Sequence, residues 1–397
     1  MEIYNASQHY TARAALRFEG AIGAHSSVVN CSVHNGLGWS ASIYKSANIH
    51  LEGNTFWVSK PVGLRVDTGT NITIKNNFVG QVTERDGDGS GGFIDKWGAY
   101  VICSLEGSTC RDVYVTGNIA AGAPYAGFVA PSYSCGDENT QKFFRDNVAH
   151  SIDGKTCKGG AGMITYANPA VSSHGSCLET SNNLAYKCTQ NGFYSVAASQ
   201  HLVVKHMTVM DNGRGGFGTR ANAPDRSNAL IEVTENNILG ESAIPDCPDA
   251  SNGDYCIKID KVAVVPGGFG GGKDLHPTSP SKFPYWKVNA HNWAGLTHFT
   301  NNKISDFGGK TMYDMRSVVL GSVPWDSDIT QPNYFYDNVF TDVAEDSFAL
   351  LASPSPGWAN GKDCGNFPCT APNNVLNSFH RTVWSGRTPY VADHLES

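Results

Sequence analysis

Oxygen-bearing side chains are spaced as calcium ligands in one acidic, glycine-rich segment of this chain. Asp86, Asp88 and Ser90 alternate along it, and Gly91 follows, as at the opening of a calcium-binding loop. The twelfth position of such a loop needs a bidentate glutamate, but Trp97 stands there. The segment therefore favours a solvated turn over a calcium site, and we expect no cofactor.

Two other motifs fall short of a binding site. The glycine-rich run 267–274 ends in Asp where a phosphate-binding loop needs Ser or Thr, and Leu-His-Pro follows it instead of a helix. His201 and His206 are an odd number of residues apart, as are His291 and His298. Such pairs face opposite sides of a regular strand, so we predict neither a nucleotide nor a metal site.

Acidic residues that could cleave a glycan would have to come together from distant parts of the chain. A glycosidase needs two carboxylates a short distance apart. The polygalacturonase signatures Asn-Thr-Asp, Gly-His-Gly and Arg-Ile-Lys do not occur in this sequence. Most Asp residues here have the setting of turn residues, so we predict no catalytic residue. The conceivable members of such a site are Asp86, Asp95, Asp146, Asp153, Asp211 and His150.

Aromatic side chains could instead line a sugar-binding surface by stacking on the apolar face of a sugar ring. Most aromatic residues of a folded chain pack in its core or under its loops, so only some of them would be available. The candidates are Trp39, Trp57, Trp97, Tyr133, Trp286 and Trp293.

A repeated unit must position all of these residues. Between Trp39 and Gly80 the chain twice runs through a strand with alternating apolar residues, a polar turn, a second strand and an asparagine. Asn54 and Asn77 close the two copies, 23 residues apart. A βαβ unit needs about 30 residues, so this period suits one coil of a right-handed parallel β-helix. Repeated asparagines can adopt the left-handed corner conformation and bond to neighbouring backbone.

The predicted fold is therefore all-β, a right-handed single-stranded parallel β-helix of roughly ten coils with long loop insertions. We predict one domain over residues 1–397, with a loop insertion at 240–284 and a loop-like tail from 353. Residues 28–33 are predicted as one strand. Later coils are predicted around Asn118, Asn147, Asn183, His206, Asn237, Asn302 and Asn338.

Composition excludes several classes of function. The net charge of -7 argues against nucleic acid as a partner. No apolar run reaches 18 residues, so we expect no membrane-spanning segment in this chain. The segment at Met1 lacks a secretion signal, and the repeat begins almost at once, so we expect a piece of a longer extracellular protein.

The eleven cysteines indicate an oxidising compartment, because several form close pairs without zinc-type spacing. The disulfide candidates are Cys103 with Cys110, Cys177 with Cys188, Cys247 with Cys256, Cys364 with Cys369, and Cys135 with Cys157, which leaves Cys31. Each bridge would add about 2–4 kcal/mol of stability. Glycosylation sequons at Asn5, Asn30 and Asn71 fit the same secretory route.

An ordered series of loose motifs resembles the parallel β-helix region of the fibrocystin and fibrocystin-L family. The motifs lie at residues 117–128, 144–150, 206–213, 237–240, 276–281 and 299–307. The resemblance implies a large cell-surface or secreted protein, often ciliary, whose β-helices lie beside other extracellular modules. The family's membrane anchor and flanking modules do not occur in this sequence. The cell-surface hyaluronidases share a related β-helix.

We therefore predict a non-catalytic extracellular module, a rigid spacer whose surface contacts other extracellular protein modules or glycans. The alternative is a carbohydrate-active β-helix enzyme, a polysaccharide lyase or a hyaluronidase-like hydrolase. An enzyme would need two carboxylates in a groove, whereas a glycan-binding module would need an aromatic surface without such a pair.

Overall fold

The computed structural model describes a set of residue ranges in two compact units, Met1–Cys188 (unit 1) and Thr189–Ser397 (unit 2). In unit 1 the described ranges are 1–7, 13–83, 97–103, 110–131, 133–134, 144–152, 160–166 and 177–188. In unit 2 they are 191–196, 201–212, 215–219, 230–240, 264–266, 296–307, 318–321, 333–343, 348–351, 363–364, 367–368, 377–380 and 383–385.

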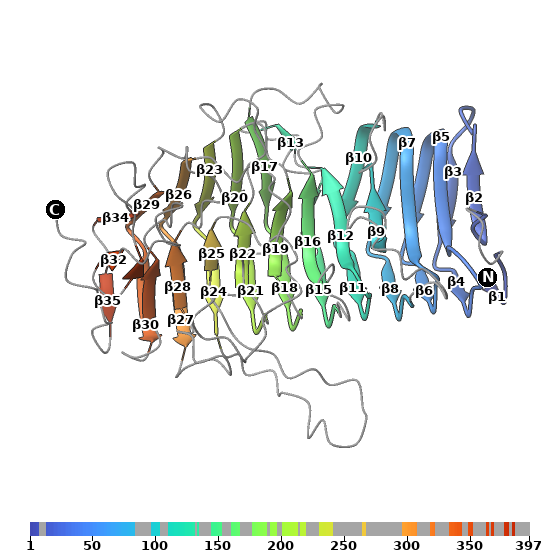
Figure 1. The fold of residues 1–397 in the computed structure, drawn as a ribbon. Coiled ribbons are helices and arrows are strands. Elements are labelled where there is room, and N and C mark those ends of the chain that lie inside the picture. Colours follow the sequence, from blue (N-terminus) through green and yellow to red (C-terminus); the bar gives the residue numbers. More distant parts are fainter. Residues whose placement is uncertain are drawn as a thin grey trace, which may run out of the picture. The chain divides into compact units, whose positions relative to one another are not determined.

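Short strands of unit 1 form one parallel sheet, in which each coil contributes a single three-residue strand (Figure 1). Alternate residues of a strand face opposite sides, so each strand turns its middle residue inward and the other two outward. The strands are β1 (Glu2–Tyr4), β4 (Ser32–His34), β6 (Thr55–Trp57), β8 (Phe78–Gly80), β11 (Ile119–Ala121), β15 (Val148–His150) and β18 (Leu184–Tyr186).

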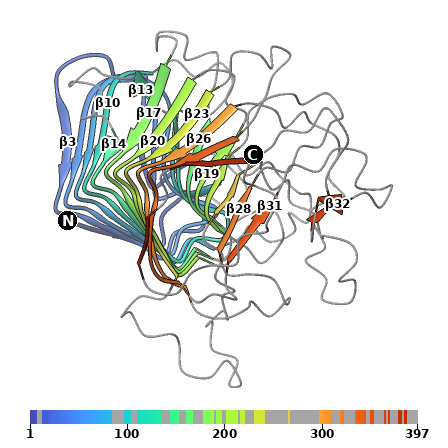
Figure 2. The ribbon, with the colours of Figure 1, turned by 90° about the vertical axis from the view of Figure 1, so that its left-hand side faces the viewer.

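Longer strands of unit 1 complete each coil. The two longest, β5 and β7, pair in parallel, and the following coil replaces β7 by two strands, β9 and β10. Viewed at 90° to Figure 1, successive coils repeat the same path (Figure 2). These strands are β2 (Leu16–Glu19), β3 (Ser26–Val29), β5 (Ala41–Glu52), β7 (Val62–Lys75), β9 (Gly98–Ile102), β10 (Cys110–Thr116), β12 (Ala126–Pro131), β13 (Tyr133–Ser134), β14 (Phe144–Arg145), β16 (Ala161–Tyr166) and β17 (Cys177–Ser181).

Unit 2 repeats this construction with three sets of parallel strands. The short-strand positions hold β21 (Thr208–Met210), β24 (Asn237–Leu239), β27 (Lys303–Phe307), β30 (Val339–Val343) and β35 (Val383–Ser385). A second set holds β20 (His201–Lys205), β23 (Leu230–Thr234), β26 (Leu296–Thr300), β29 (Asn333–Tyr336) and β34 (Asn377–His380). The third holds β19 (Asn191–Val196), β22 (Gly215–Thr219) and β25 (Val264–Pro266). Two further pairs are β28 (Val318–Gly321) with β31 (Phe348–Leu351) and β32 (Asp363–Cys364) with β33 (Phe367–Pro368).

The parallel strand pairing confirms the predicted all-β parallel β-helix, with three local corrections. The predicted strand at 28–33 is two strands, β3 and β4, because Asn30 takes a left-handed φ of 52° and turns the chain between them. Within the predicted insertion 240–284, the three residues of β25 pair with β22, so residues 264–266 belong to a coil. In the tail, β34 and β35 pair with β29 and β30, so the tail adds strands where a loop is predicted.

Apolar side chains from the short and long strands fill the interior of unit 1. Each short strand from β4 onward points its middle residue into this interior, where it is at most 1% exposed: Val33, Phe56, Val79, Ala120, Ala149 and Ala185. From the long strands, the Tyr100 and Phe128 rings stack 4.6 Å apart, and the Tyr100 hydroxyl donates to the Asn77 carbonyl at 2.8 Å. The stacked coils thereby share one core and satisfy its buried hydroxyl.

An asparagine ladder ties neighbouring coils together at the corner before each short strand. From Asn77 onward in unit 1, the Oδ1 of each ladder asparagine accepts two bonds from the asparagine one coil earlier, one from its backbone N–H and one from its Nδ2. The Nδ2 groups of the first four members also donate to a carbonyl of the preceding coil, whereas that of Asn183 donates to the carbonyl of Ser181 in its own coil. The members are Asn54, Asn77, Asn118, Asn147 and Asn183, all at most 4% exposed.

The residue before each ladder position makes the turn. It has a φ between 52° and 67°, and it is Asn30, Gly53, Asn76, Gly117, Asp146 or Asn182. The ladder asparagines do not themselves have positive φ, so the expectation that they adopt the left-handed conformation is wrong by one residue. A left-handed corner frees the next side chain to point inward, where its amide meets backbone groups that water cannot reach.

Unit 2 carries the same ladder with a different first member. The N–H of Met207 donates to Oδ1 of Asn236 at 2.9 Å, and the ladder continues through Asn302 and Asn338. In unit 1 the corresponding first position is Cys31, whose N–H donates to Oδ1 of Asn54 at 2.9 Å. At both first positions a backbone N–H is the donor to the next asparagine.

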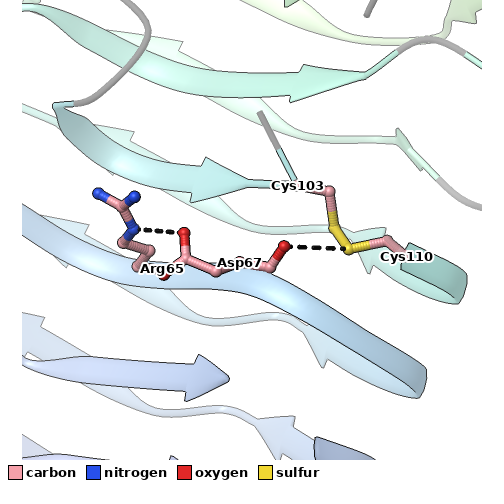
Figure 3. The surroundings of a disulfide bond; sticks show 4 residues. All are labelled: Arg65, Asp67, Cys103 and Cys110. Atoms are coloured by element: carbon pink, nitrogen blue, oxygen red, sulfur yellow. Dashed lines mark hydrogen bonds and ion pairs between the residues drawn. A yellow bond between two sulfur atoms is a disulfide. The ribbon is translucent and has the colours of Figure 1, made fainter. Parts of the chain in front are cut away.

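A disulfide joins the ends of β9 and β10, as predicted for Cys103 and Cys110 (Figure 3). The N–H of Cys103 donates to the carbonyl of Val66 at 2.7 Å, and Cys110 lies opposite Gly69 on β7. Strand β7 passes this corner without interruption, whereas in the next coil β9 and β10 are separate strands. The disulfide therefore holds β9 and β10 together where both pair with β7.

Cys188 departs from its predicted bridge with Cys177. It is a thiol at the buried position just after the corner that follows β18, a position held in earlier coils by Val82, Ala123 and Ile152. Burial raises the pKa of Cys188 to about 12, so it acts there as a small apolar side chain. Cys31 is also a thiol, and the remaining predicted pairs involve side chains outside the described residues.

The ladder makes a direct prediction for Asn118. Asn118→Ala removes the acceptor of two Asn77 donors and the donor to the Ile74 carbonyl, all buried. Unsatisfied buried groups cost about 1–3 kcal/mol each, so we expect the free energy of unfolding in a urea titration to fall by about 3 kcal/mol.

The matched control is Asn76→Gly, at the exposed corner one residue before the ladder member Asn77. Glycine adopts positive φ readily, so this change is expected to alter the unfolding free energy by less than about 0.5 kcal/mol. Equal effects of the two substitutions would contradict the assigned role of the ladder.

Candidate functional site

The outward side of the short-strand sheet in unit 1 carries a continuous run of aromatic and aliphatic residues. Strands β6, β8, β11, β15 and β18 pair in register, so their first residues form one column and their third residues form another. We call these ten residues the aromatic strip: Thr55, Trp57, Phe78, Gly80, Ile119, Ala121, Val148, His150, Leu184 and Tyr186. Trp57 and Ile119 are each 37% exposed.

Trp57 and Phe78 form one aromatic platform on this strip. Their ring centroids lie 5.8 Å apart, and their planes differ by 17°. Gly80 lies opposite Trp57 in the next coil, and a Cβ at Gly80 would come within 2.6 Å of atoms of both rings. Because Gly80 has no side chain, the two rings can occupy the space above it on the sheet.

His150 and Tyr186 form a second platform two strands further along. Their rings stack at 4.9 Å with planes 11° apart, and the residues pair directly in register. Burial lowers the pKa of His150 below its usual value, which favours the neutral imidazole. Between the two platforms lies β11, which contributes Ile119 to one column and Ala121 to the other.

Ten left-handed corner residues border the strip, six of them polar and the others glycine or valine. Before the strands are the left-handed residues Gly53, Asn76, Gly117, Asp146 and Asn182. After the strands are Val58, Gln81, Gly122, Ser151 and Lys187, also left-handed. The site is thus a narrow apolar floor with hydrogen-bonding groups along its edges.

Unit 2 does not have this surface at the equivalent positions. The first and third residues of its short strands include no aromatic side chain; they are Thr208, Met210, Asn237, Leu239, Lys303, Ser305, Val339, Thr341, Val383 and Ser385. The fold therefore accepts polar side chains there, and the aromatic strip is not required to build a coil.

Several carboxylates of the described residues form ion pairs with basic side chains. Within one strand of unit 1, Arg17 pairs with Glu19 at 2.6 Å and Arg65 with Asp67 at 2.6 Å, because residues two apart share a side of the strand. Glu52 is held by His50 at 2.9 Å and Lys75 at 3.2 Å, contacts that lower its pKa.

The described acid–base candidates make separate contacts and do not form one group. Asp146 pairs with Arg145 at 3.4 Å on an exposed corner, while His150 stacks on Tyr186. In unit 2, Asp211 is a buried left-handed corner residue whose N–H donates to the carbonyl of Leu239. Asp86, Asp95 and Asp153 lie outside the described residues, as does the Asp86–Asp88 calcium loop.

The predicted separation of histidines holds in unit 2. His201 lies 3.0 Å from Glu232, whereas His206 hydrogen-bonds Glu235 at the next corner. Burial lowers the pKa of His298, with a smaller opposing effect from Glu232. His291 lies outside the described ranges, and across those ranges no three His, Cys, Asp or Glu side chains converge as a metal site.

Of the predicted aromatic candidates, Trp57 lies on the strip. Trp39 stacks on the Arg65 guanidinium at 4.9 Å, and Trp97 packs against Tyr125 at 5.1 Å. The side chains of Tyr133, Trp286 and Trp293 are outside the described set.

Sequence reasoning missed Phe78 and Tyr186 as members of this surface. The available signal was positional, because the first and third residues after each ladder asparagine point outward. Aligning the coils on Asn54, Asn77, Asn118, Asn147 and Asn183 would have placed the whole strip in two columns.

The three sequon asparagines are accessible. Asn5, Asn30 and Asn71 are exposed corner residues with φ between 51° and 53°. Nδ2 of Asn71 donates to Oδ1 of Asn48 at 2.8 Å. Their glycosylation stays a prediction. In the described part of the chain, no helix is long and apolar enough to span a bilayer.

Comparison with known proteins gives little beyond the fold. No protein-family model matches this chain, and no curated protein matches it. Among solved structures, the A-module of mannuronan C-5 epimerase AlgE6 from Azotobacter vinelandii aligns with 98% of this chain and 89% of its own, at 12% identity and a TM-score of 0.43.

The environment of His150 predicts how its proton affects stability. Because burial lowers its pKa in the folded chain, the unfolded chain binds the proton more tightly. As pH falls from about 6.5, the free energy of unfolding should therefore decrease until the lowered pKa is passed. His150→Phe should remove this part of the pH dependence, so it becomes more stable relative to wild type as the pH falls.

Imidazole NMR titration of His150, with urea unfolding between pH 7.5 and 5, would measure both effects. A titration midpoint at or above 6.5 would rule out the assigned effect of burial.

Proposed function

We propose that this chain is a non-catalytic extracellular β-helix module of a fibrocystin-like protein, and that the aromatic strip is its contact surface. The observation that carries the proposal is the in-register exposure of Trp57, Phe78, Ile119 and Tyr186 along one sheet face. Aromatic residues that keep one face open supply binding energy at low conformational cost.

The contrast between the two units supports a binding role for the strip. A structural requirement for aromatic residues would act at the same positions in both units, but the first and third residues of the short strands of unit 2 are polar or aliphatic, such as Asn237, Leu239 and Lys303. The outward apolar residues of unit 1 therefore need another explanation, and contact with a ligand or partner supplies one.

The paired carboxylates support the non-catalytic part of the proposal. Glycan cleavage uses two carboxyl groups that act together on one bond, one of them with a raised pKa. Glu52 instead has a lowered pKa, and Asp67, Asp146 and Glu19 each lie in an ion pair with arginine.

An extracellular setting is supported by the cystine and the sequons. The Cys103–Cys110 bridge persists in oxidising compartments, and Asn5, Asn30 and Asn71 are exposed as glycan acceptors must be. Membership of the fibrocystin family rests on the sequence motifs alone and is part of the proposal.

Binding of the fluorescently labelled chain to the surface of cultured epithelial cells tests the contact surface. We expect binding by wild type, and at least a fivefold weaker signal for Trp57→Ala combined with Tyr186→Ala, since each lost aromatic contact costs about 0.5–1.5 kcal/mol. The matched control is Tyr44→Ala, which removes a 36% exposed aromatic from β5, away from the strip.

The same preparation tests the absence of catalysis. Incubation with pectin, alginate, hyaluronan and β-glucan should release no reducing ends and no unsaturated uronates, and should leave the uronate epimer ratio unchanged. Turnover in any of these assays would contradict the non-catalytic function and favour the alternative, a carbohydrate-active enzyme. Cell binding that the strip substitutions leave unchanged would contradict the assignment of the strip as the contact surface.

A further inference from the structure

We infer that the ligand of the aromatic strip is a neutral glycan chain that lies along the strip and crosses successive coils. The inference rests on the proposed function, because it names the occupant of the same surface. It follows from the width, the charge and the spacing of the strip.

The strip is too small for a stable protein interface. Each strand offers two outward residues about 7 Å apart, and five strands about 4.8 Å apart extend about 19 Å, an area on the order of 200 Å². A specific protein complex buries about 800 Å² on each partner. A single glycan chain, by contrast, is one sugar ring wide and needs only a narrow floor.

The charge of the strip favours a neutral ligand. None of its ten residues is Asp, Glu, Lys or Arg, and the corner residues along its borders carry one acid, Asp146, and one base, Lys187, which together add no net charge. An anionic glycan would need arginine or lysine along its path to offset the cost of removing its carboxylates or sulfates from water. The apolar floor instead matches the C–H face of an uncharged pyranose.

The edges of the strip carry polar groups that can bind the hydroxyl groups of a sugar. Asn76 and Asn182 lie on one border, and Gln81, Ser151 and Lys187 lie on the other. These amide, hydroxyl and ammonium groups can bond hydroxyls that project sideways from a sugar whose face rests on the floor. Stacking below with hydrogen bonds at the sides fixes a chain in register without a deep pocket.

The spacing of the two platforms sets the length of the ligand. From β6 with Trp57 to β18 with Tyr186 is four coil steps, about 19 Å. A sugar ring is about as long as one coil step, so a chain of four to six sugars is needed to reach both platforms. Between them, β11 offers the aliphatic side chains of Ile119 and Ala121 to the intermediate sugars.

Titration of the full chain with neutral hexasaccharides, followed by Trp fluorescence and calorimetry, tests the inference. The probes are cellohexaose, mannohexaose, xylohexaose and chitohexaose, with the matching disaccharides and a heparin hexasaccharide as comparisons. We expect at least one neutral hexasaccharide to bind, with its disaccharide binding at least tenfold more weakly and the heparin fragment not binding.

Variants locate the site. Trp57→Ala and Tyr186→Ala should each weaken hexasaccharide binding about three- to tenfold, since one aromatic contact is lost in each. Trp57→Phe should retain most of the affinity, and Tyr44→Ala should change it less than twofold. Circular dichroism and urea unfolding would show that each variant is folded.

Three results would overturn the inference. They are a lack of binding by all four neutral hexasaccharides, tighter binding of the heparin fragment, and binding that Trp57→Ala leaves unchanged. Cell-surface binding that depends on the strip but survives enzymatic removal of cell glycans would also overturn it in favour of a protein partner, while the proposed contact surface would stand.

Discussion

Backbone groups at one corner of every coil lie where water cannot satisfy them, and the asparagine ladder is the solution used throughout unit 1. An unpaired N–H or carbonyl in this interior would cost several kcal/mol across a few coils, about 1–3 kcal/mol for each group. Asn77, for example, accepts from Asn54, donates to Asn118 and donates to Leu51, so one side chain serves three coils. Val and Ile could fill the same volume but would leave these groups without partners.

The ladder also determines what the surface can be. Because an asparagine amide must reach the same position in every coil, the three residues after it are held in register. Thr55 then lies opposite Phe78, and Trp57 opposite Gly80. The aromatic strip is thus a consequence of internal polar bonding, since it has straight columns only because the coils cannot slip against each other.

The parts of this structure that sequence could predict are those that repeat. Alternating apolar residues and the 23-residue step from Asn54 to Asn77 predict the coil, because a strand with one apolar face requires a neighbour to bury it. The corner was predicted one residue late, since Asn76 and Asn77 are both asparagines and composition alone does not say which one turns.

The strip was harder to predict. Trp57 could be chosen for its type, but Phe78 and Tyr186 become part of a surface only through register with residues 23 or more positions away. For Cys188 the sequence spacing was misleading. It suggested a disulfide with Cys177, whereas the structure buries Cys188 as a thiol in the core.

The hydrogen bonds of the ladder all run the same way. Each asparagine receives at Oδ1 from the coil made before it and offers its own N–H to the coil made after it. A growing chain therefore completes a coil only when the next one has been synthesised, and the newest coil always carries the unmet donor. Construction of unit 1 is in this sense vectorial, from the amino-terminal coil onward. Emergence from the ribosome supplies the coils in the order in which their bonds can be closed.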